Sequence, residues 1–168
     1  EKFLEFPIQS VLIDGVPIQE YAVVYPKGAD AVTKYAAQNL VDYVKRNMGV
    51  KLTMNEDSKA EKQYEILIGN TKRAESKIST SMKEGQYVLM KKGDKIVMQG
   101  NGIYVGAAVG AFVSKNLPSN GNKKQIEINN FPWRYLIACC CKGFEQYSIH
   151  LLKLIIKLIW SKRKISKR

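Results

Sequence analysis

Residues 21–48 read YAVVYPKGADAVTKYAAQNLVDYVKRNM, and they indicate the fold because they join a strand pattern to a helix pattern. The first five residues are β-branched, aromatic or small, and Pro26-Lys27-Gly28 ends their run. From residue 29 to residue 48, apolar side chains recur every three or four positions, at Val32, Tyr35, Ala36, Leu40, Tyr43, Val44 and Met48. Asp30 lies in the first turn of this helix pattern, Lys45 and Arg46 lie in its last turn, and Gly49 follows it. The predicted amphipathic helix therefore has a physical stop at each end.

The residues before this stretch predict a β-hairpin. Asp14-Gly15 separates two short apolar runs, residues 11–13 and 16–18, and an Asp-Gly pair in that setting is a strong hairpin signal. We expect the second arm of the hairpin to continue through residues 21–25.

The residues after the helix predict further strands and a second helix. Strand patterns occupy residues 50–52, 64–68, 86–90, 95–99 and 125–128, with a charged loop at 55–62 and a four-residue hairpin loop at 91–94. Residues 103–115 form a helix pattern rich in glycine and alanine, whose small side chains should let another element approach closely. The predicted fold is therefore α/β, a mixed β-sheet with two main helices packed in layers, followed by a basic amphipathic helical tail.

The basic charge of the chain does not indicate nucleic-acid binding. The net charge is +12 over 168 residues, but residues 142–168 hold eight Lys or Arg and one acid, which leaves +5 for residues 1–141. A nucleic-acid groove would need basic and aromatic side chains gathered on a folded face. We therefore expect one domain at residues 1–132, a basic and hydrophobic tail at residues 133–168, and no nucleic-acid partner.

No constellation of residues in the predicted domain indicates catalysis, a metal or a cofactor. The only histidine, His150, lies in the tail, and the only cysteines are consecutive, Cys139 to Cys141, which excludes a disulfide framework and a CxxC zinc site. Gly100-Asn101-Gly102 imitates a dinucleotide fingerprint, but Val105 stands where the third glycine belongs. The acids Asp42, Glu56, Asp57, Glu61 and Glu65 are interpreted as solvated charges rather than the carboxyl pair of a glycosidase.

The order and spacing of several segments resemble a known family, although no single segment is specific. These segments are residues 21–26, 36–44, 48–52, 64–71, 84–89 and 96–100. Together, over roughly residues 8–117, they resemble the N-terminal domain of alpha-glucuronidases and the related domain of beta-N-acetylhexosaminidases. The chain departs from the family pattern at Val105, before Gly106, and at residues 112–115, and the likeness ends after Asn130.

The resemblance implies a small α/β accessory domain that stands before a catalytic (β/α)-barrel and carries no catalytic residues itself. No barrel is encoded in these 168 residues. We therefore expect a non-catalytic accessory domain of a secreted polysaccharide-degrading glycoside hydrolase, with the missing barrel as its partner. The expected location is extracellular or at the cell surface, with a signal peptide removed upstream of Glu1.

Two alternatives remain open from the sequence. The first is a free-standing carbohydrate-binding module, which should show an exposed row among Tyr21, Tyr25, Tyr35, Tyr43, Tyr64, Tyr87 and Tyr104. The periodicity assigns most of these tyrosines to the core.

The second alternative is a membrane-surface or partner-binding protein that acts through its tail. The apolar run at residues 149–160 is interrupted by two lysines and is too short to span a bilayer. A helix in the interface of an anionic membrane fits it better, with contacts from Lys153, Lys157, Trp160, Lys162, Arg163 and Lys164. The tail could equally be a truncated or out-of-frame continuation of a longer gene, since the family likeness has ended there.

Overall fold

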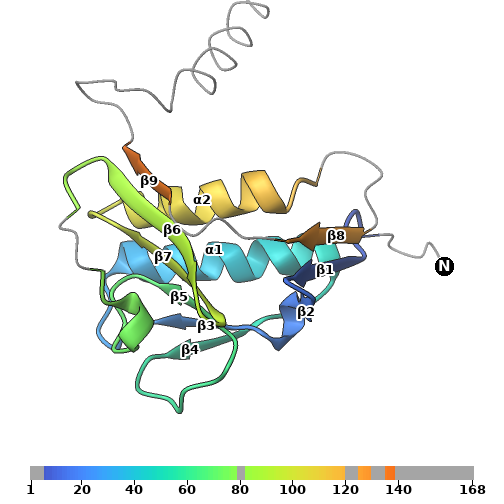
Figure 1. Ribbon diagram of the computed structural model, residues 1–168, viewed down its shortest axis with the longest axis horizontal. Coiled ribbons are helices and arrows are strands. Elements are labelled where there is room, and N and C mark those ends of the chain that lie inside the picture. Colours follow the sequence, from blue (N-terminus) through green and yellow to red (C-terminus); the bar gives the residue numbers. More distant parts are fainter. Residues whose placement is uncertain (1–5, 79–81, 120–124, 130–134, 139–168) are drawn as a thin grey trace, which may run out of the picture.

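The computed structural model describes residues 6–78, 82–119, 125–129 and 135–138. It contains a three-stranded sheet, a six-stranded sheet and two α-helices (Figure 1). The prediction of an α/β fold with mixed strands and two main helices is confirmed, whereas the predicted helical tail lies outside the described residues. The strands form two sheets, where the sequence suggested one.

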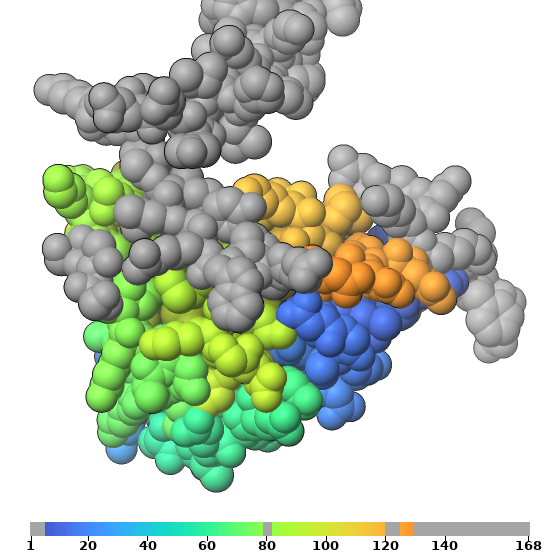
Figure 2. Space-filling model, viewed as in Figure 1, coloured from blue at the N-terminus to red at the C-terminus, as the bar shows by residue number. Residues whose placement is uncertain are grey.

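The small sheet joins the N-terminal hairpin to a strand from far along the chain. Its order is β2 (Val16–Pro17), β1 (Ser10–Ile13) and β8 (Gln125–Ile128), with β1 antiparallel to β2 and parallel to β8. Asp14 and Gly15 take φ angles of 49° and 82°, as a two-residue hairpin turn with left-handed central residues requires. Figure 2 shows β8, in orange, lying against the blue hairpin.

The large sheet has the order β4-β3-β5-β7-β6-β9. The strands are β3 (Ala22–Tyr25), β4 (Thr53–Glu56), β5 (Glu65–Ile68), β6 (Gln86–Lys92), β7 (Lys95–Gly100) and β9 (Tyr135–Ala138). Strands β4, β3, β5 and β7 run parallel, and β6 is antiparallel to both β7 and β9. Strand β9 lies beyond residue 132, so residues 135–138 of the segment expected as a tail pair with the sheet.

Three local predictions from the sequence were wrong. The hairpin arm does not continue through residues 21–25, because a 3-10 turn at Ile18–Glu20 buries Ile18 and sends β3 into the other sheet. The strand expected at residues 50–52 lies at 53–56, where it pairs with β3, and so takes in part of the expected charged loop. The second hairpin has a two-residue turn, because Lys92 and Lys95 still pair.

Helix α1 (Ala31–Met48) ends at the predicted residue and begins two residues after the predicted start, with Asp30 as its N-cap rather than in its first turn. The Asp30 carboxylate accepts a 2.7 Å hydrogen bond from the Thr33 amide, and Gly49 takes a φ of 71° at the other end. The predicted apolar stripe is wrong at two positions, since Val32 and Tyr35 are 37% and 68% exposed. The buried side chains of α1 are Ala36, Ala37, Leu40, Val41, Val44 and Met48. The buried side of the helix therefore does not include Val32 or Tyr35.

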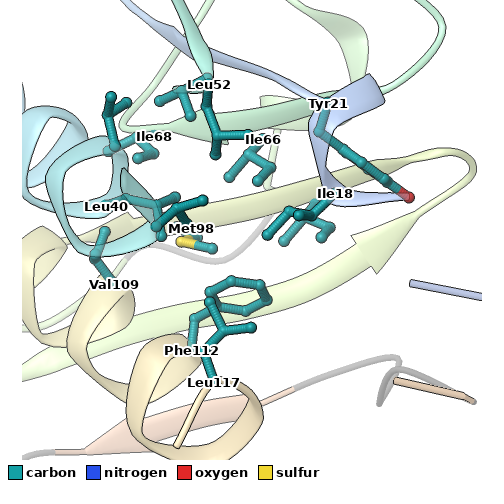
Figure 3. Close-up of a cluster of buried hydrophobic side chains, with 14 of the residues drawn as sticks. Ile18, Tyr21, Leu40, Leu52, Ile66, Ile68, Met98, Val109, Phe112 and Leu117 are labelled. Carbon is teal, nitrogen blue, oxygen red and sulfur yellow. The ribbon is translucent and has the colours of Figure 1, made fainter. Parts of the chain in front are cut away.

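Both helices cover one face of the large sheet, and the main core lies between these layers. Figure 3 shows Leu40 of α1 and Val109 and Phe112 of α2 (Tyr104–Asn116) converging on Ile66 and Met98 of the sheet. A smaller apolar cluster lies on the opposite face of the sheet, formed by Ala22, Val24, Leu67, Val88, Met90 and Val97 with Ile78 and Met82 packed against it. The large sheet is therefore covered on both faces.

The glycines of α2 do not have the role predicted for them. A Cβ atom at Gly106 or Gly110 would meet nothing within 4 Å, so no other element packs closely against either residue. The close approach occurs at Gly100, where β7 turns into α2. A Cβ there would lie under 3.0 Å from backbone atoms of Tyr104 and Val105.

Tyr21 is a buried residue whose hydroxyl has no hydrogen-bond partner among the described residues. Burial, followed by the negative charges of Asp14 and Asp94, raises the pKa of Tyr21 to about 12. We expect Tyr21→Phe to leave the free energy of unfolding unchanged or to raise it by up to about 1 kcal/mol, because the substitution removes a desolvated hydroxyl and keeps the ring. Urea denaturation checks this, and a loss above about 1 kcal/mol would show that the hydroxyl is bonded in solution.

Candidate functional site

A cluster of charged side chains lies on the face of the large sheet opposite the helices. Glu65 and Lys95 are the first residues of β5 and β7 and are paired across the ladder. Side chains two apart on a strand share a face, so these two lie on the same face as Leu67 and Val97. Glu65 is 1% exposed and Lys95 is 4% exposed, and such burial of charge demands partners.

Arg73 closes over Glu65 in a two-pronged ion pair. Its Nε and Nη2 atoms donate to the Glu65 carboxylate over 2.9 and 3.1 Å. The guanidinium also donates to the backbone carbonyl oxygens of Asp57 and Lys59, at 3.1 and 3.0 Å. The hydrogen bond to Glu65 raises the pKa of Arg73, so the side chain stays charged. One side chain thus ties two loops to the start of β5.

Lys95 lies among three carboxylates. Its Nζ atom donates to Glu61 and lies 3.4 Å from Glu75 and 3.6 Å from Glu65. Burial alone would lower the pKa of Lys95, but the hydrogen bond to Glu61 and the three negative charges together raise it. The same hydrogen bond lowers the pKa of Glu61, so both groups remain ionised at neutral pH.

Asp57, from a buried position, joins the loop of Lys27 to the loop that contains Lys72 and Arg73. It is 5% exposed, and its two carboxylate oxygens accept hydrogen bonds from the Lys27 and Lys72 amides, each 2.8 Å long. The interpretation of Asp57 and Glu65 as solvated charges was therefore wrong. Sequence periodicity could not predict the burial of these two carboxylates, because the amides and the guanidinium that stabilise them belong to residues 8 to 30 positions away.

Hydrogen bonds between neutral groups extend the cluster toward the far end of β7. The Gln99 side-chain amide donates to the backbone oxygens of Gly69 and Ser76, and the Thr71 and Ser76 hydroxyls lie 2.5 Å apart. We call Asp57, Glu61, Glu65, Arg73, Glu75 and Lys95 the charged cluster. Its carboxylates are paired with cations or with backbone amides, and these contacts join the loops to the sheet.

The exposed tyrosine row that a carbohydrate-binding module would need is not present among the seven tyrosine side chains that the structure describes. Tyr21 and Tyr87 are buried, and only Tyr35 is exposed. Tyr43 is partly buried, and its hydroxyl donates to the Leu117 carbonyl oxygen over 2.5 Å. The assignment of most tyrosines to the core is correct.

A shallow hollow of about 500 Å³ lies between α1 and the edge strand β4. Its lining residues are Tyr25, Gln38, Val41, Lys51, Leu52, Thr53 and Met54. Val41 and Leu52 are buried, whereas Gln38, Lys51 and Thr53 are exposed, so an apolar floor carries a polar rim. Sequence reasoning missed this site, because its lining residues come from β3, α1 and residues 51–54, which are separated along the chain.

A second uncommitted surface is the outer side of the helix pair. It contains Val32, Tyr35, Ile103, Gly106, Ala107, Gly110 and Ser114, which we call the helix face. Ile103 is 68% exposed, and α2 carries a single charged residue, Lys115. A helix without charges on its outer side is typical of helices that are covered all round.

The residues proposed for membrane contact, Lys153 to Lys164, lie outside the described residues, as do all three cysteines and His150. Within the described ranges, no helix is long and apolar enough to cross a membrane. Within the same ranges, no group of three or more His, Cys, Asp or Glu side chains could hold a metal ion.

No protein-family model matches the chain, and no curated protein matches it significantly. The resemblance to the accessory domains of alpha-glucuronidases therefore stays a prediction that depends on the order and spacing of residues.

Proposed function

We propose that residues 1–132 are a non-catalytic accessory domain of a secreted polysaccharide-degrading glycoside hydrolase, and that this domain is a scaffold for a catalytic barrel. The proposal is supported by the resemblance over residues 8–117 and by the charged cluster, whose carboxylates are held by Arg73, Lys95 and backbone amides. A glycosidase needs two carboxyl groups that flank a sugar, and these carboxylates are occupied within the fold.

The observation that carries the scaffold role is the helix face. A protein gains stability by covering exposed apolar surface, at roughly 25 cal/mol per Å². The helix face exposes Tyr35 of α1 and Ile103 at the start of α2, and α2 carries one charged residue, Lys115. This surface is therefore suited to packing against a neighbouring domain.

The parent gene tests this proposal. DNA downstream of the Asn129 and Asn130 codons is expected to encode a (β/α)-barrel in one of its reading frames. When that longer polypeptide is produced, Ile103→Asp should lower its melting temperature and loosen its barrel, measured by limited proteolysis. Downstream DNA with no barrel in any frame would contradict the proposal.

A carbohydrate-binding role is the second candidate, and the hollow beside β4 favours it. Saccharides bind to sites that pair an apolar surface with a few side-chain hydrogen-bond donors, and the hollow offers Tyr25 with Gln38 and Lys51. If it binds sugar, xylan or chitin oligomers should give calorimetric heats at millimolar concentration. Lys51→Ala and Gln38→Ala should weaken these heats, because both side chains are exposed and leave the core intact. An absence of heat at millimolar ligand would remove this candidate.

A further inference from the structure

We propose that Asn101 is a site of spontaneous deamidation, at which the backbone nitrogen of Gly102 attacks the side-chain amide. Both residues are exposed, and they lie in the turn that joins β7 to α2. Glycine has no side chain to obstruct the approach of its nitrogen to the preceding amide carbon, so an Asn-Gly pair in an exposed turn favours this reaction. The proposal uses neither a barrel nor a sugar, so it stands or falls independently of the proposed function.

The reaction needs water as its co-reactant and involves no oxidation or reduction. The Gly102 nitrogen loses its proton to solvent and forms a bond to Cγ of Asn101, while the Cγ–Nδ2 bond breaks and releases ammonia. Water then opens the resulting succinimide ring. Attack of water at Cγ gives aspartate, whereas attack at the main-chain carbonyl carbon gives isoaspartate, in which the chain continues through the former side chain.

The turn leaves the Gly102 nitrogen free for this attack. Strand β7 ends at Gly100 and α2 begins at Tyr104, so Gly102 lies outside the hydrogen bonds of both elements. Within the described residues, its N–H donates no hydrogen bond. Gly102 takes a φ of 57°, and a Cβ atom there would meet nothing within 4 Å, so open space surrounds the residue.

The Asn101 amide is held by a bond that solvent can replace. Its Nδ2 atom donates to the carbonyl oxygen of Met82 over 3.1 Å, at an exposed position. Exchange of such a bond for one to water changes the free energy little, because both states keep a partner. The side chain can therefore turn toward the Gly102 nitrogen without local unfolding.

Asn39 is an exposed asparagine of the same chain that the fold should protect. It lies inside α1, where the N–H of Leu40 donates to the Ala36 carbonyl oxygen four residues earlier. Attack by the Leu40 nitrogen therefore requires local opening of the helix, which lowers the rate in proportion to the population of the open form. The chain thus contains its own matched control.

Deamidation should change the contacts at the start of α2. The Asn101 N–H donates to the Gln86 carbonyl oxygen, and the Asn101 carbonyl oxygen accepts from the Tyr104 N–H, each over 3.2 Å. Isoaspartate adds an atom to the main chain next to Gly100, where even a Cβ would lie under 3.0 Å from backbone atoms. The isoaspartate product should therefore loosen the first turn of α2. The aspartate product keeps the backbone and places a negative charge near the N-terminus of α2, where it is favourable.

Peptide mass spectrometry of the full chain, incubated in its folded form at neutral pH, tests this proposal. Trypsin releases residues 96–115 and residues 35–45, each with a single asparagine, Asn101 in the first and Asn39 in the second. The first peptide should gain the mass that marks exchange of an amide NH2 for OH, and its fragmentation should show isoaspartate. A sample digested without incubation corrects for reaction during digestion.

Incubation in guanidinium chloride measures the reaction at each asparagine in the unfolded chain. Folding should slow the reaction less than about tenfold at Asn101 and more than about tenfold at Asn39. Asn101→Gln keeps an exposed amide, but its longer side chain disfavours ring closure, so its peptide should keep its mass. A peptide 96–115 that keeps its mass in the folded chain, or protection of Asn101 as strong as that of Asn39, would overturn the proposal. A mass gain that persists in Asn101→Gln would place the reaction at Gln99 and overturn it equally.

Discussion

Arg73→Ala should lower the free energy of unfolding by roughly 3–5 kcal/mol, because it leaves the Glu65 carboxylate buried without its main partner. Glu65 is 1% exposed and receives two guanidinium hydrogen bonds, so water cannot replace what the substitution removes. The same change also frees the loop carbonyls of Asp57 and Lys59. Urea denaturation at pH 7 measures the loss, and hydrogen exchange of residues 57–77 should speed up before the rest of the domain opens.

Lys91→Ala is the control for this prediction. Lys91 pairs with Asp14 at a more exposed position, where the two side chains are 17% and 31% exposed. Loss of such an ion pair should cost less than about 1 kcal/mol. If Arg73→Ala lowers the free energy of unfolding no more than Lys91→Ala does, the charged cluster does not stabilise the packing of the loops against the sheet.

Gly100→Ala should destabilise the domain by about 3 kcal/mol or more, because the added methyl group overlaps backbone rather than a movable side chain. A Cβ at this position would lie under 3.0 Å from Tyr104 and Val105 backbone atoms, so the first turn of α2 would have to move off the sheet. This movement would also disturb Val105 and Phe112, which are buried in the main core. Thermal and urea denaturation at one fixed protein concentration measure the effect.

Gly106→Ala, in helix α2, should raise the free energy of unfolding rather than lower it. Its Cβ would meet nothing within 4 Å, and alanine is the better helix former, so a gain of up to about 1 kcal/mol is expected. Equal losses at both glycines would contradict the assignment of close packing to Gly100 rather than to Gly106.

Local chemistry made part of this fold predictable from the sequence. Asp14-Gly15 encodes a two-residue turn in adjacent residues, and Asp30 and Gly49 encode the two ends of α1 in the residues themselves. The alternation in residues 125–128 likewise appears directly as exposed and buried positions. In each of these cases the interacting residues lie a few positions apart, so a short stretch of sequence is enough to predict the structure.

The candidate sites depend on contacts that no short window contains. The burial of Asp57 is stabilised by amides 30 and 15 residues away, and that of Glu65 by Arg73 in the following loop. The hollow beside β4 forms only when α1 lies over an edge strand. The exposure of Tyr35 depends on how far α1 turns over the sheet, which periodicity defines only to within about one residue position.

The central proposal is that the described part of the chain is a scaffold whose charged cluster stabilises the fold and does not hydrolyse a glycoside. A turnover assay of the purified chain on aryl glycosides and on xylan and chitin oligomers tests this claim most directly. We expect hydrolysis no faster than in buffer for the unmodified chain and for Glu61→Gln and Glu75→Gln, the two most exposed acids of the charged cluster. Hydrolysis that the unmodified chain performs and that either substitution abolishes would contradict the account.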